Sequence, residues 1–70
     1  MRKSVFEVSD QTVARRIVEE AVRRKLACKI EGTEAARPLI TITHREYERD
    51  AAEMIVRSLD PSARRLLDAQ

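Results

Sequence analysis

Cysteine, glycine, proline and aromatic residues are all scarce in this sequence of 70 residues, which has one cysteine, one glycine, two prolines and no tryptophan. The single cysteine, Cys28, excludes the internal disulfide framework that supports many small secreted folds. No apolar run approaches the roughly 20 residues of a membrane span, and the first residues lack the apolar stretch of a signal peptide. We therefore expect a cytoplasmic protein with no membrane segment.

The same scarcities argue against several kinds of site. Gly32 is the only glycine, so there is no glycine-rich loop to hold a phosphate. Phe6 and Tyr47 are the only aromatic residues, whereas a nucleic-acid-binding sheet normally exposes aromatic side chains that stack on bases. One histidine, one cysteine and two methionines are too few for a zinc or copper site within one chain. We predict no cofactor and no metal.

Charged residues are abundant but balanced, with 14 Lys and Arg against 12 Asp and Glu and a net charge of +2. The two signs are interleaved along the chain, which is typical of a solvated surface rather than of a basic stripe for nucleic acid. The apolar fraction of 43% is too high for a disordered chain. We expect residues 1–70 to form a single domain, and association with another surface would stabilise so small a core.

The first half of the chain predicts a strand followed by a helix. Residues 3–8 alternate with period two, and Phe6 lies on the side expected to be buried. Ser9 and Asp10 then offer side-chain oxygens to the free N–H groups of a helix start. Apolar residues follow with helical spacing, which predicts a helix over residues 11–26.

Two further alternating runs, residues 27–31 and 38–43, predict an antiparallel hairpin around the polar connection 32–37. Ile40 and Ile42 are expected to face the helices. The outer face of the sheet is then expected to carry Val5, Glu7, Leu39 and Thr41.

The last part of the chain predicts two helices. The run Thr43-His44-Arg45-Glu46 matches a capping box at the start of the first of them. The apolar face of this helix is expected to consist of Tyr47, Ala51, Met54, Ile55 and Leu59. Asp60 and Pro61 then predict a short C-terminal third helix over residues 62–69. The expected fold is α+β and ferredoxin-like, in the order βαββα, with a three-stranded antiparallel sheet and two helices on one face.

Cys28 and His44 are the only residues that could form a cysteine-histidine nucleophilic pair. The hairpin places Cys28 opposite Ile42, so that His44 lies diagonally across, about 7 to 8 Å away at the backbone. Cys28 also shares a strand face with Ile30, where a cysteine commonly serves as a small buried apolar residue. We interpret both residues as structural and expect the chain not to be an enzyme.

Residues 9–30 resemble the first strand-helix-strand unit of the CutA family, in which a run of the Lys-Leu-Ala-Ala-Cys type leads into the second strand, similar to Lys25-Leu26-Ala27-Cys28 here. The run 40–43, and the helix that ends at Leu59-Asp60-Pro61, are similar to that family's third strand and second helix. CutA proteins also have a long aromatic-rich hairpin, replaced here by residues 32–37, and a further strand after the second helix. The resemblance implies a ferredoxin-like core related to CutA and the trimeric PII signalling proteins, and it carries no ligand site to this chain.

The element order and the length also resemble a small bacterial family of signal-transducing proteins. Their second helix carries an acidic and alanine-containing pattern similar to that of residues 48–53. This second resemblance implies the same βαββα arrangement and a regulatory role.

Two functions are compatible with these patterns. The first is a regulatory or protein-interaction module that acts through its sheet face or a free strand edge, as a homo-oligomer or with a protein partner. Its predicted interaction surface consists of Val5, Glu7, Leu39 and Thr41. The alternative is a small nucleic-acid-binding regulator. It would use the basic cluster at the end of the first helix, which consists of Arg23, Arg24, Lys25 and Lys29.

Overall fold

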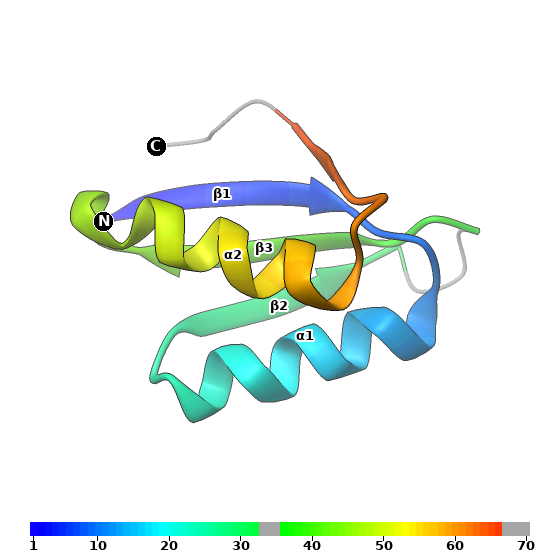
Figure 1. Ribbon diagram of the computed structural model, residues 1–70, viewed down its shortest axis with the longest axis horizontal. Coiled ribbons are helices and arrows are strands. Elements are labelled where there is room, and N and C mark those ends of the chain that lie inside the picture. The colour runs from blue at the N-terminus through cyan, green and yellow to red at the C-terminus, as the bar shows by residue number, and fades with distance from the viewer. Residues whose placement is uncertain (33–35, 67–70) are drawn as a thin grey trace.

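Within residues 1–32 and 36–66, which the computed structural model describes, two helices and four strands follow one another as β-α-β-β-α-β (Figure 1). Neither of these helices is long and apolar enough to span a membrane. The elements are β1 Arg2–Glu7, α1 Gln11–Arg23, β2 Ala27–Glu31, β3 Leu39–His44, a short 3-10 helix η1 Glu46–Glu48, α2 Arg49–Leu59 and β4 Arg64–Arg65.

The strands form one sheet in the order β2-β3-β1-β4, and each neighbouring pair is antiparallel. As a result β1 and β2 run in the same direction on either side of β3. The register places Phe6 opposite Ile40 and Cys28 opposite Ile42, and the second pairing confirms the one predicted from the hairpin. The centre of that hairpin, residues 33–35, lies outside the described residues.

The expected sheet of three strands is wrong, because the chain after α2 adds β4 to the free side of β1. We expected residues 62–69 to form a third helix that starts at Asp60. Asp60 does bind a backbone N–H, since its Oδ1 accepts a hydrogen bond from Ser62 N at 3.1 Å, but this bond closes a turn. The chain then runs along β1, and residues 67–69 of the expected helix lie outside the described part.

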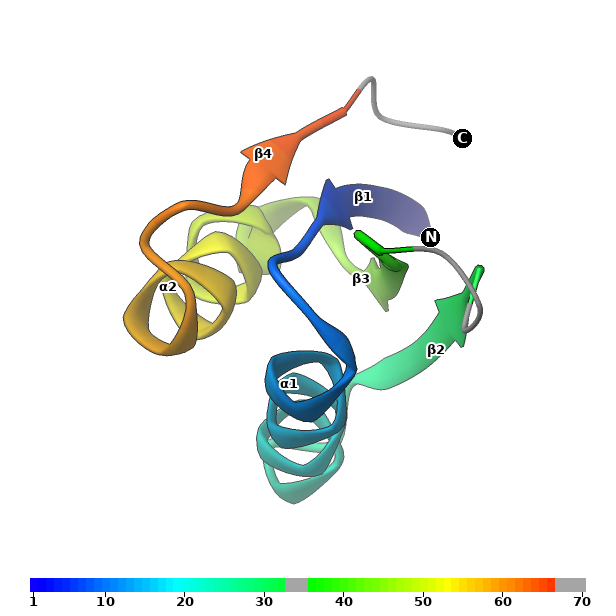
Figure 2. The same cartoon turned by 90° about the vertical axis from the view of Figure 1, so that its right-hand side faces the viewer.

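Both helices lie on the same face of the sheet, and the core fills the space between the two layers (Figure 2). Ile40 and Ile42 have no exposed surface, which confirms that they face the helices. Full burial of a side chain of this size contributes about 1.5 to 3 kcal/mol to folding. The buried core consists of Phe6, Val8, Ala14, Ile17, Ala21, Leu26, Ile40, Ile42, Ala52, Ile55, Val56 and Ala63.

Helix α1 begins as predicted and ends earlier than predicted. Val13 N donates to the Asp10 side chain at 2.9 Å, which confirms Asp10 as the N-cap. The helix ends at Arg23 because Lys25 takes a left-handed conformation with φ of 63°. Leu26 N then donates to Ala21 O at 2.8 Å, the bond that closes a Schellman motif. This turn returns the chain toward the sheet, where Leu26 is buried.

Helix α2 begins later than predicted, and its buried face is displaced. The expected capping box at Thr43 is wrong, because Thr43 belongs to β3 and pairs with Lys3. Instead Arg45 N donates to Glu48 Oε1 at 2.8 Å, and η1 precedes the helix.

The apolar face expected for α2 is correspondingly wrong in part. Tyr47 and Met54 are 77% and 72% exposed, and Ala51 is exposed as well. The buried residues of α2 are Ala52, Ile55 and Val56. Residues 52, 55, 56 and 59 follow helical spacing as residues 51, 54, 55 and 59 do, so periodicity alone did not decide which of these two overlapping stripes faces the sheet.

Candidate functional site

The four residues of the predicted interaction surface are brought together on the outer face of the sheet. Val5 lies directly opposite Thr41, and Glu7 lies directly opposite Leu39. Each is partly exposed, whereas the residues between them in β1 and β3 are buried under the helices. Side chains at directly opposite positions lie about 4.5 to 5.5 Å apart at Cβ, so these four are in mutual contact range.

Leu66 extends this surface and was missed in the sequence, where it was assigned to the third helix. Leu66 N donates to Val5 O at 2.8 Å, which continues the pairing of β4 with β1 by one residue. Leu66 is also partly exposed. We define the outer patch as Val5, Leu39, Thr41 and Leu66.

The outer patch has no cover within residues 1–32 and 36–66, because both helices occupy the opposite face (Figure 2). At the end of β1, Glu7 accepts a hydrogen bond from Arg37 Nε at 2.9 Å. Arg37 Nη2 also donates to Ser62 O at 3.4 Å, so this ion pair joins the start of β3 to the turn before β4. The Glu7 carboxylate therefore borders an apolar stripe and already has a cationic partner.

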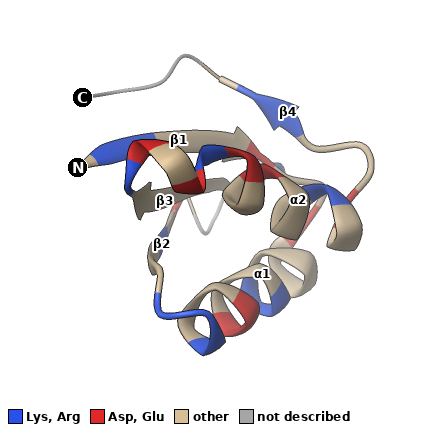
Figure 3. Cartoon of the chain, turned by 60° about the vertical axis from the view of Figure 1, so that its left-hand side comes forward, with Lys and Arg blue, Asp and Glu red and all other residues tan. Residues whose placement is uncertain are grey.

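The basic cluster at the end of α1 is exposed, and its charges are partly compensated (Figure 3). Arg23 and Arg24 both contact Glu20, at 3.3 and 3.1 Å. Lys29 contacts Glu31 at 3.1 Å. Exposed ion pairs of this kind contribute little to stability and are screened by salt. These contacts do not favour the nucleic-acid alternative, which stays a prediction.

Cys28 and His44 do not share a proton in this structure. Burial raises the pKa of the Cys28 thiol to about 11, which disfavours the thiolate that a nucleophile requires. His44 is buried, and its two ring nitrogens have other partners: Nε2 lies 2.7 Å from Ser4 Oγ and Nδ1 lies 2.7 Å from Arg45 O. The interpretation of both residues as structural agrees with this geometry.

The contact between Ser4 and His44 has the geometry of a nucleophile and its base, and it had no signal in the sequence. A carbonyl can only accept, so His44 Nδ1 donates to Arg45 O, and in a neutral imidazole Nε2 would then accept from the Ser4 hydroxyl. Arg65 Nη2 in turn donates to Ser4 Oγ at 3.3 Å. However, Ser4 has no exposed surface, so no substrate can reach its oxygen. The three side chains form a structural network between β3, β1 and β4.

Arg65 also links β4 to helix α2 through side-chain contacts. Its guanidinium donates to Glu53, and its Cζ lies 5.7 Å from the centroid of the Phe6 ring. Arg57 Nε donates to the other carboxylate oxygen of Glu53 at 3.1 Å, and Arg57 Nη1 donates to Ala63 O at 2.8 Å. The hydrogen bonds from Arg57 and then Arg65 hold the pKa of Glu53 below its ordinary value. This network, rather than a long strand, stabilises the β4 edge.

Asp60 joins the turn before β4 to the loop before α1. Its carboxylate accepts hydrogen bonds from Ser9 N and Ser9 Oγ, both at 2.7 Å, and from Ser62 Oγ at 2.7 Å. Burial by itself would raise the pKa of Asp60, but the hydrogen bonds from Ser62 and Ser9 outweigh it and lower the pKa below the ordinary value. Asp60 is only 4% exposed, and the four hydrogen-bond donors around its carboxylate favour the ionised form.

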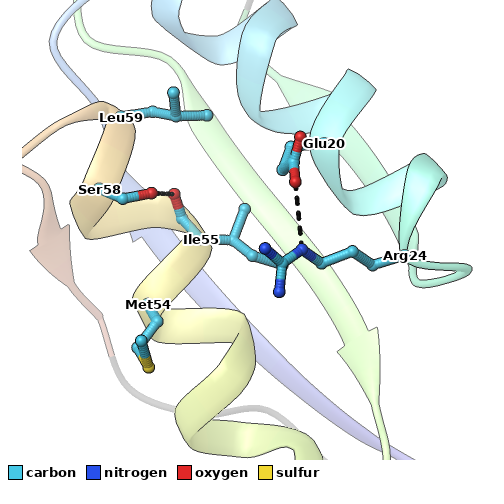
Figure 4. A pocket seen from close by; sticks show the side chains of 6 residues that line it. All are labelled: Glu20, Arg24, Met54, Ile55, Ser58 and Leu59. Carbon is cyan, nitrogen blue, oxygen red and sulfur yellow. Dashed lines mark hydrogen bonds and ion pairs between the residues drawn. The ribbon is translucent and has the colours of Figure 1, made fainter.

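The groove between the two helices is small, with a volume of about 220 Å³ (Figure 4). Such a volume is below the range typical of small-molecule sites. Within residues 1–32 and 36–66 no three His, Cys, Asp or Glu side chains are grouped closely enough to hold a metal ion. The lining side chains are Glu20 and Arg24 of α1, which bind each other, and Met54, Ile55, Ser58 and Leu59 of α2.

No family model matches the chain, and no curated protein is significantly similar to it. The resemblances to CutA and to the bacterial signal-transducing family stay predictions. The function is therefore inferred from the surfaces of the fold.

Proposed function

We propose that this chain is a small regulatory or protein-interaction module of the ferredoxin-like type, which works as a homo-oligomer through the outer face of its sheet. The order β-α-β-β-α-β and the sheet order β2-β3-β1-β4 support the assignment of fold type. A reducing cytoplasm would suit the free thiol of Cys28.

The observation that carries this proposal is the outer patch. Val5, Leu39 and Leu66 are apolar and only partly buried, and no described element packs on them. Two sheets that pack face to face lie about 10 Å apart and bury such side chains completely. Each of these partly exposed side chains would then contribute at most about 1 kcal/mol to association.

Catalysis and cofactor binding have weaker support in the same structure. The Ser4 hydroxyl is buried and the Cys28 thiol is protonated at neutral pH. The helix groove of about 220 Å³ is lined by an ion pair and exposed Met54 rather than by convergent polar groups. The apolar surface of the sheet is the feature that an interaction module requires.

The proposal can be tested by light scattering on the wild-type chain over a range of concentrations. We expect a mass that is a multiple of the single chain, and we expect Leu39→Glu to lower it, because a carboxylate at this position, between Glu7 and Glu31 of the neighbouring strands, cannot be buried without a partner. Met54→Glu is the matched control, since Met54 is 72% exposed on the helix layer. A strictly monomeric wild-type chain at millimolar concentration would contradict the proposal.

A further inference from the structure

Strand β2 forms one edge of the sheet, and none of the described residues pairs with it on the side away from β3. It is five residues long, Ala27–Glu31, whereas β4 at the other edge has two residues. An edge strand of this length presents a row of unpaired N–H and C=O groups that another strand can bind. The β2 edge is therefore a second surface of the sheet, distinct from the outer patch.

Along the β2 edge, the side chains on the helix-covered inner face of the sheet are apolar. Cys28 and Ile30 point toward α1 and are only partly buried. Val22 is 60% exposed and lies on α1, which packs against β2. Glu20 and Arg24 face α2 across the helix groove, and a residue two positions from Glu20 lies about 200° away around the helix. Val22 therefore lies on the side of α1 that borders the free edge.

A second copy can pair antiparallel with β2 about a two-fold axis perpendicular to the sheet. Directly opposite residues in an antiparallel pair have side chains on the same face. Residues of the inner face, Cys28 and Ile30, must then lie opposite inner residues, and those of the outer face, Ala27, Lys29 and Glu31, must lie opposite outer residues. This condition leaves few registers.

Charge selects one of these registers. When the axis passes through Ile30, Lys29 of each copy lies opposite Glu31 of the other, which gives two ion pairs of opposite sign. In the other registers, Lys29 or Glu31 lies opposite the same residue of the second copy, or neither lies opposite a β2 residue of the opposite charge. Like charges directly opposite each other destabilise a sheet. Within one chain the exposed Lys29 and Glu31 form an ion pair at 3.1 Å, so the pairing of two copies would bring four charges of alternating sign together.

We propose that a second copy of this chain pairs edge to edge with β2, antiparallel, about a two-fold axis through Ile30. Lys29 then binds Glu31 of the partner copy and Glu31 binds Lys29 of the partner copy, while the two Ile30 side chains meet on the inner face. Both sheets join into one sheet of eight strands, with the two α1 helices side by side on its inner face. This inference goes beyond the outer patch, because it uses a different surface and a different kind of contact.

The test uses the full chain with Val5→Glu, which places a carboxylate in the outer patch on β1, the strand that β3 separates from β2. By analytical ultracentrifugation we expect this variant to form a dimer. Adding Lys29→Glu, or adding Glu31→Lys, should weaken the dimer about tenfold or more, because both ion pairs become repulsive. An equimolar mixture of these two variants should dimerise again, since one carries two acidic residues on this strand face and the other two basic ones. Lys3→Glu on β1 is the control of equal charge change.

A covalent readout checks the register. With Cys28→Ser in place, Ile30→Cys should form a disulfide-linked dimer on mild oxidation, because directly opposite Cα atoms lie about 4.5 to 5.5 Å apart. Lys29→Cys in the same background is the control, since its two copies would be diagonal and about 7 to 8 Å apart.

Three outcomes would overturn the inference: a Val5→Glu chain that is monomeric at millimolar concentration, single charge reversals that fail to recombine, or equal cross-linking at positions 29 and 30. In the first case a wild-type oligomer would still support the outer patch. A dimer that follows the charge reversals but is unaffected by Val5→Glu would support the edge and contradict the outer patch.

Discussion

At one edge of the sheet β4 is two residues long and held by side chains, whereas at the other edge β2 is five residues long and pairs on one side only within the described part of the chain. The β4 edge depends on Arg65, which binds Glu53 and Ser4 and lies over Phe6, and on the turn organised by Asp60. At the β2 edge, the ion pair found among the described residues joins the exposed Lys29 and Glu31. The first edge is thus protected from strand addition by its shortness, and the second is open to it.

The largest effect is expected from breaking the turn before β4. Asp60→Ala removes the acceptor of four hydrogen bonds and leaves Ser9 N without its partner, so the free energy of unfolding should fall by about 3 kcal/mol. Urea denaturation measures this loss. Asp10→Ala is the comparison, since it removes one exposed cap bond and should cost about 1 kcal/mol. Equal effects of the two substitutions would show that Asp60 does not organise this edge.

The same carboxylate predicts a pH dependence. The pKa of Asp60 is lower in the folded chain than its ordinary value of 3.8, so its contribution to stability is present above about pH 4. The contribution is lost as the pH falls from there through the lower folded-state pKa. The stability difference between wild type and Asp60→Asn should therefore shrink on acidification, as urea curves at pH 7, 5 and 3 would show. A constant difference would contradict this assignment.

A smaller effect is expected from Arg65→Ala, which separates β4 from α2 and from Ser4. The loss of its bonds to Glu53 and of its contact with Phe6 should cost about 2 kcal/mol. Arg64→Ala is the matched control, because the neighbouring Arg64 is exposed and lies on the other face of the strand. If both substitutions changed the unfolding midpoint equally, the anchoring role of Arg65 would be refuted.

The smallest effect concerns the entry into β2. Lys25 has φ of 63°, a left-handed conformation that costs a non-glycine residue on the order of 1 kcal/mol. Lys25→Gly should therefore raise the free energy of unfolding by up to about 1 kcal/mol, while Lys25→Ala should leave it nearly unchanged. Thermal unfolding compares the two. A destabilising Lys25→Gly would mean that the lysine side chain makes a contribution larger than the backbone cost.

Local patterns were sufficient where short-range periodicity decides the structure. The alternation in β1 and β3 placed Ile40 and Ile42 inside, and the same alternation brought Val5 and Thr41 together on the outer face. Asp10 was identified as a cap because its side chain binds an N–H only three residues away.

Patterns that serve two structures were misinterpreted. Asp60 followed by proline is a signature of a helix start, yet the same carboxylate also closes a turn on Ser62. Likewise a Thr-x-x-Glu run matches a capping box, although Thr43 belongs to β3 and pairs with Lys3. Local hydrogen-bonding capacity does not distinguish these outcomes, because the competing partner lies far away in the sequence.

The sequence by itself determined the α+β class, the first four elements in order, and which residues of β1 and β3 face outward, because periods of two and 3.6 residues are properties of the local backbone. Only the tertiary structure decided that the chain after α2 is a strand, because this strand depends on long-range contacts. Arg65 donates to Glu53 of α2, and Leu66 donates to Val5 of β1. The free edge of β2 was decided in the same way. An edge exists only when all the strands are in place, so no local pattern can report it.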